Sequence, residues 1–447
     1  MGDLAKIFKA YDVRGLVPDE FDEPVAEAVG AAFAEVTGAA SAVVAHDMRE
    51  SSPVLADAFI RGARSRGVDV VHAGLGSTDL LYYASGSLGL PGVMFTASHN
   101  PAQYNGMKMC RAGAVPISGD TGLTEIRDRA AELIGVRGTP TGSLIEKDLL
   151  PGYADHLRKL VDLSGIRRLK VVVDAGNGMG GHTVPEVFDG LPIDLTPLYF
   201  ELDGSFPNHD ANPLEPANLV DVRRVVVETG ADIGLAFDGD ADRCWVIDER
   251  GESVSPSSIT ALVAVRELAK HPGATIIHNL ITSLSVPEIV REHGGEPVRT
   301  RVGHSFIKAE MARTGAVFGG EHSAHYYFRD FWFADSGMLA ALHVLAALGE
   351  QDEPLSRVVS AYSRYHSSGE INSTVADQDA ALRRVREAFA GRGEPDELDG
   401  LTVNGAGWWF NLRASNTEPL LRLNAEAADQ STMTAVRDEV LGLLREV

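Results

Sequence analysis

The sequence predicts an α/β fold with several domains, and three observations support this. Short β-branched segments alternate with longer helical patterns, which is typical of strand–helix units around largely parallel sheets. The predicted strands recur in three sets of three, each of the form β-α-β-α-β. The end of the chain breaks this pattern. At about 150 residues per domain, 447 residues suggest about three domains, but three sets and a different end favour four.

The expected elements follow one another along the chain. The strands are centred on Val44, Val70 and Met94, then on Val172, Asp194 and Leu235, and then on Ile276, Val298 and Val317. The clearest helical patterns lie at 24–36, 53–66, 218–228 and 257–269. Each third strand leads into a polar loop. Ligands of open α/β sheets bind beyond the carboxyl ends of strands, so these three loops are expected to carry the chemistry.

The last part of the chain predicts a small α+β domain. Apolar and aromatic strand segments at 401–413 and 420–424 flank a polar loop, and a helix at 431–446 follows. We place domain boundaries near residues 145, 253 and 367. The expected domains are therefore 1–145, 146–252, 253–366 and 367–447.

Composition excludes several classes of protein. There are 40 basic and 63 acidic residues, a formal net charge of −23, which argues against nucleic-acid binding and against docking on an anionic membrane. Two distant cysteines form no disulfide framework, and Met1–Lys9 lacks the apolar core of a signal peptide. The most apolar helical stretch, Gly337–Leu348, is too short to span a bilayer. We therefore expect a cytoplasmic protein.

The strongest local signal is the loop Asp238-Gly-Asp-Ala-Asp-Arg243. Its three carboxylates follow an apolar strand, and Gly239 allows the backbone to curl so that they can converge. Oxygen ligands suit Mg²⁺ or Ca²⁺, and a cation would relieve their mutual repulsion. A solvated acidic turn is the alternative. A calcium-hand loop does not fit, because Arg243 stands where that loop needs glycine.

A second loop, Thr96-Ala-Ser-His-Asn-Pro101, follows the strand 93–95. Ser98 at the carboxyl end of a strand is well placed as a nucleophile or a carrier of a phosphoryl group. His99 could act as a base. The competing interpretation is that Ser98 only caps the next segment, and the residues alone leave both open.

Two further loops offer binding groups. Arg413, Ser415, Asn416 and Thr417 combine a guanidinium with short hydrogen-bonding side chains, which favours an oxyanion site. The loop 319–325 offers Glu321 and Ser323 as hydrogen-bond partners for hydroxyls. Its histidines, His322 and His325, are interpreted as ordinary loop residues rather than metal ligands. The glycine-rich segment 174–181 is interpreted as a structural turn rather than a dinucleotide site.

Taken together, these motifs resemble the α-D-phosphohexomutases, in their phosphomannomutase/phosphoglucomutase branch. The resemblance covers the whole chain in order, through segments at 8–15, 96–101, 104–108, 238–243, 303–305, 320–325 and 413–419. It implies four domains around a central cleft, the first three sharing one β-α-β-α-β topology. It implies an isomerase of carbohydrate metabolism that interconverts hexose 6-phosphate and hexose 1-phosphate.

The resemblance also implies roles for particular residues. Ser98 would carry the phosphoryl group, and Mg²⁺ would sit on Ser98, Asp238, Asp240 and Asp242. A hexose 1,6-bisphosphate would be the intermediate and primer. Proton transfer and phosphate contacts near Ser98 would fall to the residues Lys108, His304, Arg14 and His99. Substrate would be held by Arg243, Gly303, Glu321, Ser323, Arg413, Ser415, Asn416 and Thr417.

Two loops favour the mannose/glucose branch over phosphoglucosamine mutases, namely Thr96-Ala-Ser and Arg413-Ala-Ser-Asn-Thr. One departure is that the segment 278–284 has no Lys or Arg, where related bacterial enzymes often carry a basic residue. A metal-dependent sugar phosphatase and a non-catalytic sugar-phosphate binder are the alternatives from other classes. The expected partners are small hexose phosphates, with neither nucleic acid nor membrane, and the chain is expected to be a monomer or weak homo-oligomer.

Overall fold

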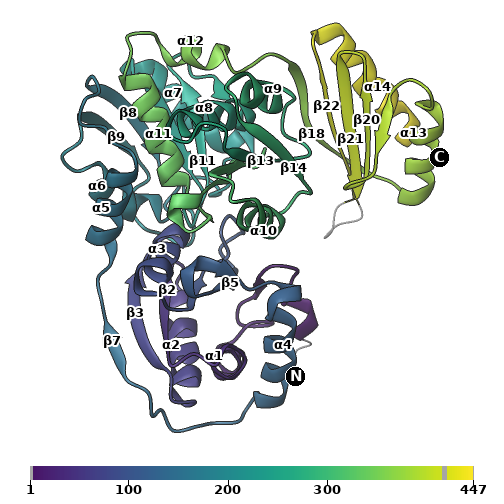
Figure 1. Cartoon of the computed structure of the whole chain (residues 1–447). Coiled ribbons are helices and arrows are strands. Elements are labelled where there is room, and N and C mark those ends of the chain that lie inside the picture. The colour runs from purple at the N-terminus through teal and green to yellow at the C-terminus, as the bar shows by residue number, and fades with distance from the viewer. Residues whose placement is uncertain (1–3, 415–419, 446–447) are drawn as a thin grey trace. The chain divides into compact units, whose positions relative to one another are not determined.

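The computed structural model of the chain describes residues 4–414 and 420–445 (Figure 1). It divides into two compact units. The first comprises Met1–Pro256 and Ser323–Val358, and the second comprises Ser257–His322 and Val359–Val447. None of the helices in these described stretches is long and apolar enough to cross a membrane.

The first unit begins with a seven-stranded sheet in the order β1-β5-β4-β2-β3-β7, with β6 paired to β5. The strands are β1 (Val13–Leu16), β2 (Ser41–His46), β3 (Asp69–Leu75), β4 (Gly92–Phe95), β5 (Tyr104–Arg111), β6 (Val115–Pro116) and β7 (Leu144–Glu146). Its apolar core packs against α1 (Glu23–Thr37), α2 (Ser52–Arg64) and α4 (Leu123–Leu133). Helix α3 (Thr78–Leu88) lies against β2, β4 and β5.

A second sheet of the same unit has the order β12-β11-β10-β8-β9. Its strands are β8 (Leu169–Asp174), β9 (Ile193–Leu198), β10 (Ile233–Phe237), β11 (Cys244–Asp248) and β12 (Ser253–Val254). Helices α5 (Leu150–Leu160), α6 (Gly180–Phe188) and α7 (Val220–Thr229) accompany it. The unit also holds the hairpin β16 (Tyr326–Phe328) and β17 (Ala334–Asp335), and helix α11 (Gly337–Gly349), which contacts β11 and is buried almost throughout.

The second unit contains three parallel strands and a separate antiparallel sheet. The parallel strands are β13 (Thr275–Asn279), β14 (Glu296–Thr300) and β15 (Phe318–Gly320), with helices α8 (Pro256–Lys270), α9 (Ser285–Glu292) and α10 (His304–Thr314). The antiparallel sheet has the order β18-β22-β21-β20-β19. It comprises β18 (His366–Thr374), β19 (Glu394–Asp396), β20 (Leu401–Gly405), β21 (Trp408–Ala414) and β22 (Leu420–Ala427), and its core includes α13 (Gln378–Ala388) and α14 (Gln430–Arg445).

The expected repeat is confirmed by the pairing of the strands. In each set the first strand lies between the other two, as β4-β2-β3, β10-β8-β9 and β15-β13-β14. All pairs within these sets are parallel, so their carboxyl ends share one edge. The third strand of the last set begins at Phe318, later than expected. The left-handed cap at Gly315 ends α10, and the backbone joins the sheet only after that turn.

Candidate active site

Ser98 lies in the loop beyond β4, and its side chain is 3% exposed. Its φ of 52° is a conformation that residues other than glycine rarely adopt. The hydroxyl donates a hydrogen bond to Asp238 Oδ2 at 2.8 Å and accepts one from Arg243 Nη2 at 3.2 Å. The nucleophile predicted from sequence therefore meets the acidic loop directly, across 140 residues of chain.

The acidic loop follows β10 and turns tightly enough to bring three carboxylates together. One oxygen from each of Asp238, Asp240 and Asp242 lies within 4.8 Å of the others, and all three side chains are buried. The turn needs glycine at 239, because a Cβ there would lie 2.4 Å from the carbonyl oxygen of Ser98. The same close approach seats the acidic loop on the Ser98 loop.

These carboxylates have unused ligand atoms. Within the part of the chain that is described, Asp240 Oδ1 and Asp242 Oδ1 are buried and accept no hydrogen bond. Burial, together with the charge of Asp240, raises the pKa of Asp242 to about 6. Buried carboxylate oxygens that accept no hydrogen bond fit a hard cation with oxygen ligands, so the donor set suits Mg²⁺.

Two side chains donate hydrogen bonds to the second carboxylate oxygen of Asp240, Oδ2. Lys108, on β5, donates from Nζ to Asp240 Oδ2 at 2.7 Å and also to Asp242 Oδ2. Thr78, the first residue of α3, donates from Oγ1 to Asp240 Oδ2 at 2.6 Å. Burial alone would lower the pKa of Lys108, but the carboxylates of Asp240 and Asp242 raise it above its ordinary value. In this arrangement Lys108 is a cation, whereas a general base needs a lowered pKa.

Two arginines and His99 surround the serine. Arg243 donates from Nε to Asp238 at 2.9 Å and contacts His99 Nδ1, which lies 3.3 Å from Ser98 Oγ. Arg14 contacts Asn100 Oδ1 in the Ser98 loop, and its Nε donates to a neighbouring carboxylate at 2.8 Å. Burial, with the charges of Arg243 and Arg14, lowers the pKa of His99 well below its ordinary value. The ring is therefore neutral at pH 7.

His325 belongs to the same cluster, although its sequence context favoured an ordinary loop residue. Its Nε2 lies 3.8 Å from Asp242 Oδ1, and its Nδ1 lies 2.9 Å from Ser323 Oγ. Burial lowers its pKa to about 4 even though Asp242 opposes the shift. Ser323 is thus placed beside His325, and a neutral imidazole faces the acidic loop.

The second unit holds the remaining predicted residues. Glu321 is 2% exposed, and its Oε1 accepts from Asn279 Nδ2 at 3.2 Å and from the Gly303 amide at 3.3 Å. Gly303 precedes α10, whose first residue is His304. Asn279 belongs to the segment 278–284 that lacks a basic residue. The structure thus links this segment to Glu321 through an amide.

Arg413 lies on β21 of the antiparallel sheet, where its Nη2 donates to Glu370 at 2.9 Å. It is 7% exposed. The rest of the predicted oxyanion loop lies outside the described residues, namely Ser415, Asn416 and Thr417.

Sequence reasoning missed Thr78, Arg49 and His325. Thr78 and Arg49 lie just beyond the carboxyl ends of β3 and β2, which are parallel to β4. The rule that chemistry gathers at this edge could have found them if it had been applied to every strand of a set rather than only to the third. His325 lies in a motif that was noted, but its Asp242 neighbour is distant in sequence.

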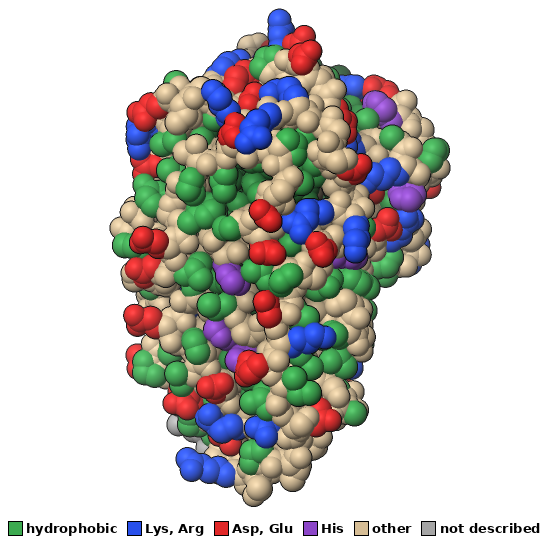
Figure 2. Space-filling model, turned by 90° about the vertical axis from the view of Figure 1, so that its left-hand side faces the viewer, with side chains coloured by type: hydrophobic (Ala, Val, Ile, Leu, Met, Phe, Trp, Pro, Cys, Tyr) green, Lys and Arg blue, Asp and Glu red, His purple; other side chains and the backbone are tan. Residues whose placement is uncertain are grey.

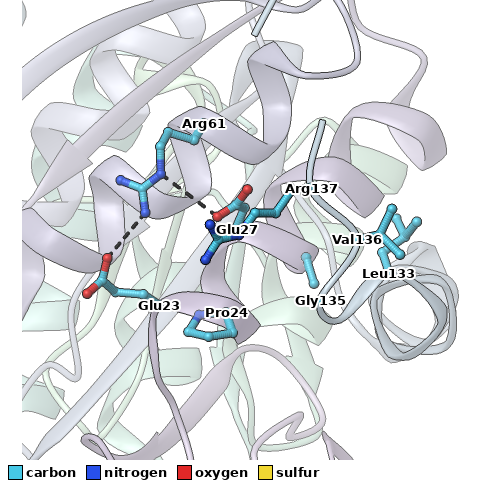
Figure 3. Close-up of a pocket in the computed structure, with 9 residues that line it drawn as sticks. Glu23, Pro24, Glu27, Arg61, Leu133, Gly135, Val136 and Arg137 are labelled. Atoms are coloured by element: carbon cyan, nitrogen blue, oxygen red, sulfur yellow. Dashed lines mark hydrogen bonds and ion pairs between the residues drawn. The ribbon is translucent and has the colours of Figure 1, made fainter. Parts of the chain in front are cut away.

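A separate hollow of about 310 Å³ occurs between α1, α2 and the segment 133–137 (Figure 3). There Arg61 pairs with Glu23 at 3.2 Å and with Glu27 at 3.8 Å, and the side chains of Arg61 and Glu23 are exposed. It shares no residue with the Ser98 cluster. On the face shown in Figure 2, acidic and basic side chains are interspersed rather than separated into patches.

Four domain models of one family match the chain. They are the phosphoglucomutase/phosphomannomutase α/β/α domain I at residues 5–134, domain II at 151–251, domain III at 255–365 and the C-terminal domain at 370–443.

Curated relatives match over nearly the full length. A protein of Xanthomonas campestris named "Phosphohexose mutases" is 42% identical over 98% of this chain and 99% of its own length. A phosphomannomutase of Salmonella montevideo is 41% identical over 98% of each chain. A phosphomannomutase of Escherichia coli is 40% identical over 98% of this chain and 99% of its own.

Solved structures share the architecture. A phosphoglucomutase/phosphomannomutase family protein from Burkholderia thailandensis is 34% identical and has a TM-score of 0.90. The match covers 100% of this chain and 98% of that one. An N-acetylphosphoglucosamine mutase from Aspergillus fumigatus has a TM-score of 0.63 over 98% of this chain and 95% of that one. At 14% identity this second likeness concerns the fold alone.

Proposed function

The chain belongs to the phosphoglucomutase/phosphomannomutase family and is a mutase, an intramolecular phosphotransferase, and from that premise we propose how it works. It interconverts hexose 6-phosphate and hexose 1-phosphate by way of a phosphoryl group on Ser98 and a hexose 1,6-bisphosphate. The observation that carries this is the position of Ser98 Oγ, 2.8 Å from Asp238 and within hydrogen-bond distance of Arg243.

In the proposed reaction the bond between phosphorus and Ser98 Oγ breaks while a bond to a sugar hydroxyl oxygen forms. The hydroxyl proton passes to a base, and the bisphosphate then turns. Ser98 Oγ attacks the other phosphorus, the bond between that phosphorus and its sugar oxygen breaks, and the sugar oxygen takes the proton back from the base. Such transfers are catalysed mainly by positioning and by neutralising charge. Arg243, Arg14 and Lys108 supply fixed positive charge around the transferring group.

We assign the base that accepts the hydroxyl proton to a histidine with a neutral imidazole. His325 is neutral at pH 7, so its imidazole is free to accept a proton. His304 remains a prediction from sequence. The raised pKa of Lys108 favours its role as a cation.

Asp238, Asp240 and Asp242 would hold Mg²⁺, with a phosphoryl oxygen on Ser98 completing the set. When bound, the ion neutralises charge on the phosphoryl group and acts as a Lewis acid. The unused Oδ1 atoms of Asp240 and Asp242 support this assignment.

Glu321 and Ser323 would each bind sugar hydroxyls through hydrogen bonds. Arg413 with the residues 415–417 would bind the phosphate that is not reacting. We propose hexoses of the mannose/glucose type as substrates, supported by the phosphomannomutase names of relatives at about 40% identity. A phosphoglucosamine mutase is the alternative, because the segment 278–284 offers Asn279 rather than a basic residue.

The test is an assay of mannose 1-phosphate and glucose 1-phosphate turnover with Mg²⁺ and a hexose 1,6-bisphosphate primer. We expect conversion to the 6-phosphates without net release of inorganic phosphate, and loss of activity on chelation. Ser98→Ala should remove nearly all activity while the melting temperature stays close to that of the wild type. Stoichiometric phosphate release would instead indicate a phosphatase, and substantial activity of Ser98→Ala would refute the carrier role.

A further inference from the structure

Arg49 is an arginine just beyond β2 that has no part in the mechanism above. It is 1% exposed, and its guanidinium bonds four backbone carbonyls of one loop. Nη2 donates to Ser98 O at 2.9 Å and to Asn100 O at 2.7 Å. Nη1 donates to Pro101 O and Tyr104 O, each at 2.9 Å. The Arg49 side chain therefore holds the backbone of the Ser98 loop at four points.

The third nitrogen of the guanidinium, Nε, pairs with a buried carboxylate. Nε donates to Asp47 Oδ2 at 3.2 Å, and Asp47 Oδ1 accepts from the Arg49 amide at 3.0 Å and from Ser52 Oγ at 2.5 Å. Asp47 is fully buried and supplies the countercharge that a buried arginine requires. Arg49 thus has one fixed orientation.

A loop that follows β9 encloses Arg49 from outside. The ring of Phe206 lies 5.2 Å from the guanidinium carbon. At Gly204 a Cβ would lie 2.7 Å from the Cα of Arg49, so this position needs glycine. Arg49 is therefore held between the Ser98 loop and the loop that follows β9. Phe206 and Gly204 leave it no room to move away from the four carbonyls of the Ser98 loop.

We propose that Arg49 is a positioning residue for phosphoryl transfer, which sets the place of Ser98 Oγ through the Ser98 carbonyl. This rests on the proposed function, because it takes Ser98 as the phosphoryl carrier. The φ of 52° at Ser98 is unfavourable unless the surroundings hold it, and the bond from Arg49 holds the Ser98 carbonyl in this conformation. The planar fork is required, because a lysine offers a single nitrogen and cannot reach four carbonyls.

The test compares Arg49→Met and Arg49→Lys with a matched control, Arg64→Lys. Arg64 lies on α2 and also donates to a backbone carbonyl, that of Gly142 at 2.9 Å, away from Ser98. Displacing a reacting group by about 1 Å can cost about 100-fold in rate, so we expect kcat of Arg49→Met to fall by about 100-fold. KM for the hexose phosphate should stay within about two-fold, since Arg49 contacts no substrate. Arg64→Lys should leave both parameters unchanged.

The phosphorus NMR resonance of the phosphoserine is the second readout. It should shift in folded Arg49→Met and Arg49→Lys but not in Arg64→Lys, whereas a purely structural role would lower the melting temperature without moving it. A folded Arg49→Met with kcat within three-fold of wild type, or Arg49→Lys with wild-type kcat, would overturn the proposal. If Arg49→Met does not fold, Arg49→Lys decides.

Ser98→Ala separates the two proposals. If it is active, the carrier role itself fails. If it is inactive while Arg49→Lys turns over at the wild-type rate with an unshifted resonance, only the role of Arg49 is refuted.

Discussion

Replacing Thr78 with valine tests how the acidic loop is held. The Thr78 hydroxyl donates to Asp240 Oδ2 at 2.6 Å, and both side chains are fully buried. Valine has nearly the same shape, so the substitution removes a donor without opening a cavity. The bond between Lys108 and Asp240 remains, as does the backbone bond from the Thr78 amide to the Asp240 carbonyl at 3.0 Å.

A hydrogen bond to a charged acceptor contributes about 1.5–3 kcal/mol. If that bond holds Oδ2 so that Oδ1 is free for Mg²⁺, its loss should weaken Mg²⁺ binding by about 10- to 100-fold, at about 1.4 kcal/mol per factor of ten. Thr78→Ser keeps the hydroxyl and should restore most of the affinity.

Calorimetric titration with Mg²⁺ and the Mg²⁺ dependence of turnover measure this effect. The matched control is Thr183→Val, because the buried Thr183 hydroxyl donates at 3.2 Å to the uncharged Met179 carbonyl within its own helix. That control should change Mg²⁺ affinity by less than about two-fold. A Thr78→Val protein that melts normally and binds Mg²⁺ as tightly as the wild type would refute the reasoning.

Two further predictions concern buried carboxyl groups. Burial raises the pKa of Asp79 from 3.8 to about 6, so the folded chain binds this proton more tightly than the unfolded chain. Stability should then fall by about 3 kcal/mol as pH rises from about 4 to 6 and level off above that. Asp79→Asn lacks this proton, so the melting temperature of wild type relative to Asp79→Asn should fall over that range, and a constant difference would contradict the shift. Glu321→Gln should lower kcat/KM by about 10- to 100-fold, because a charged hydrogen-bond acceptor for the sugar is lost. Phosphorylation of Ser98, measured by intact mass, should persist. Glu267→Gln, at a buried glutamate of the same unit, should leave kcat/KM unchanged, and equal values for the two variants would refute the role of Glu321.

The fold was largely predictable because its signals are local and repeated. Strand composition and spacing gave three equivalent sets, and the common strand order places the first strand of each set in the middle. The sequence did not predict that Ser257–His322 and Ser323–Val358 fall into different compact units. Helix α11 is apolar around most of its surface, so its sequence does not indicate which neighbours bury it.

The site was predictable where chemistry requires unusual residues. Three aspartates in one turn indicate a cation, and Ser98 at a strand end indicates a nucleophile. Thr78 and Arg49 carry no such signal, since threonine and arginine have many structural roles. Protonation states also needed the structure. Lys108 was a candidate base from sequence, and only its two carboxylate partners show why its proton is retained.

The long span between Ser98 and its partners has a consequence for synthesis of the chain. Ser98 is made 140 residues before Asp238, and Thr78 is made 162 residues before Asp240. At about 5–20 residues per second, a ribosome needs roughly 7–30 seconds more to supply these partners. Until then Ser98 Oγ lacks both of its side-chain partners from the second sheet, Asp238 and Arg243. The reactivity proposed for Ser98 would therefore begin only once the second sheet has been made and has folded.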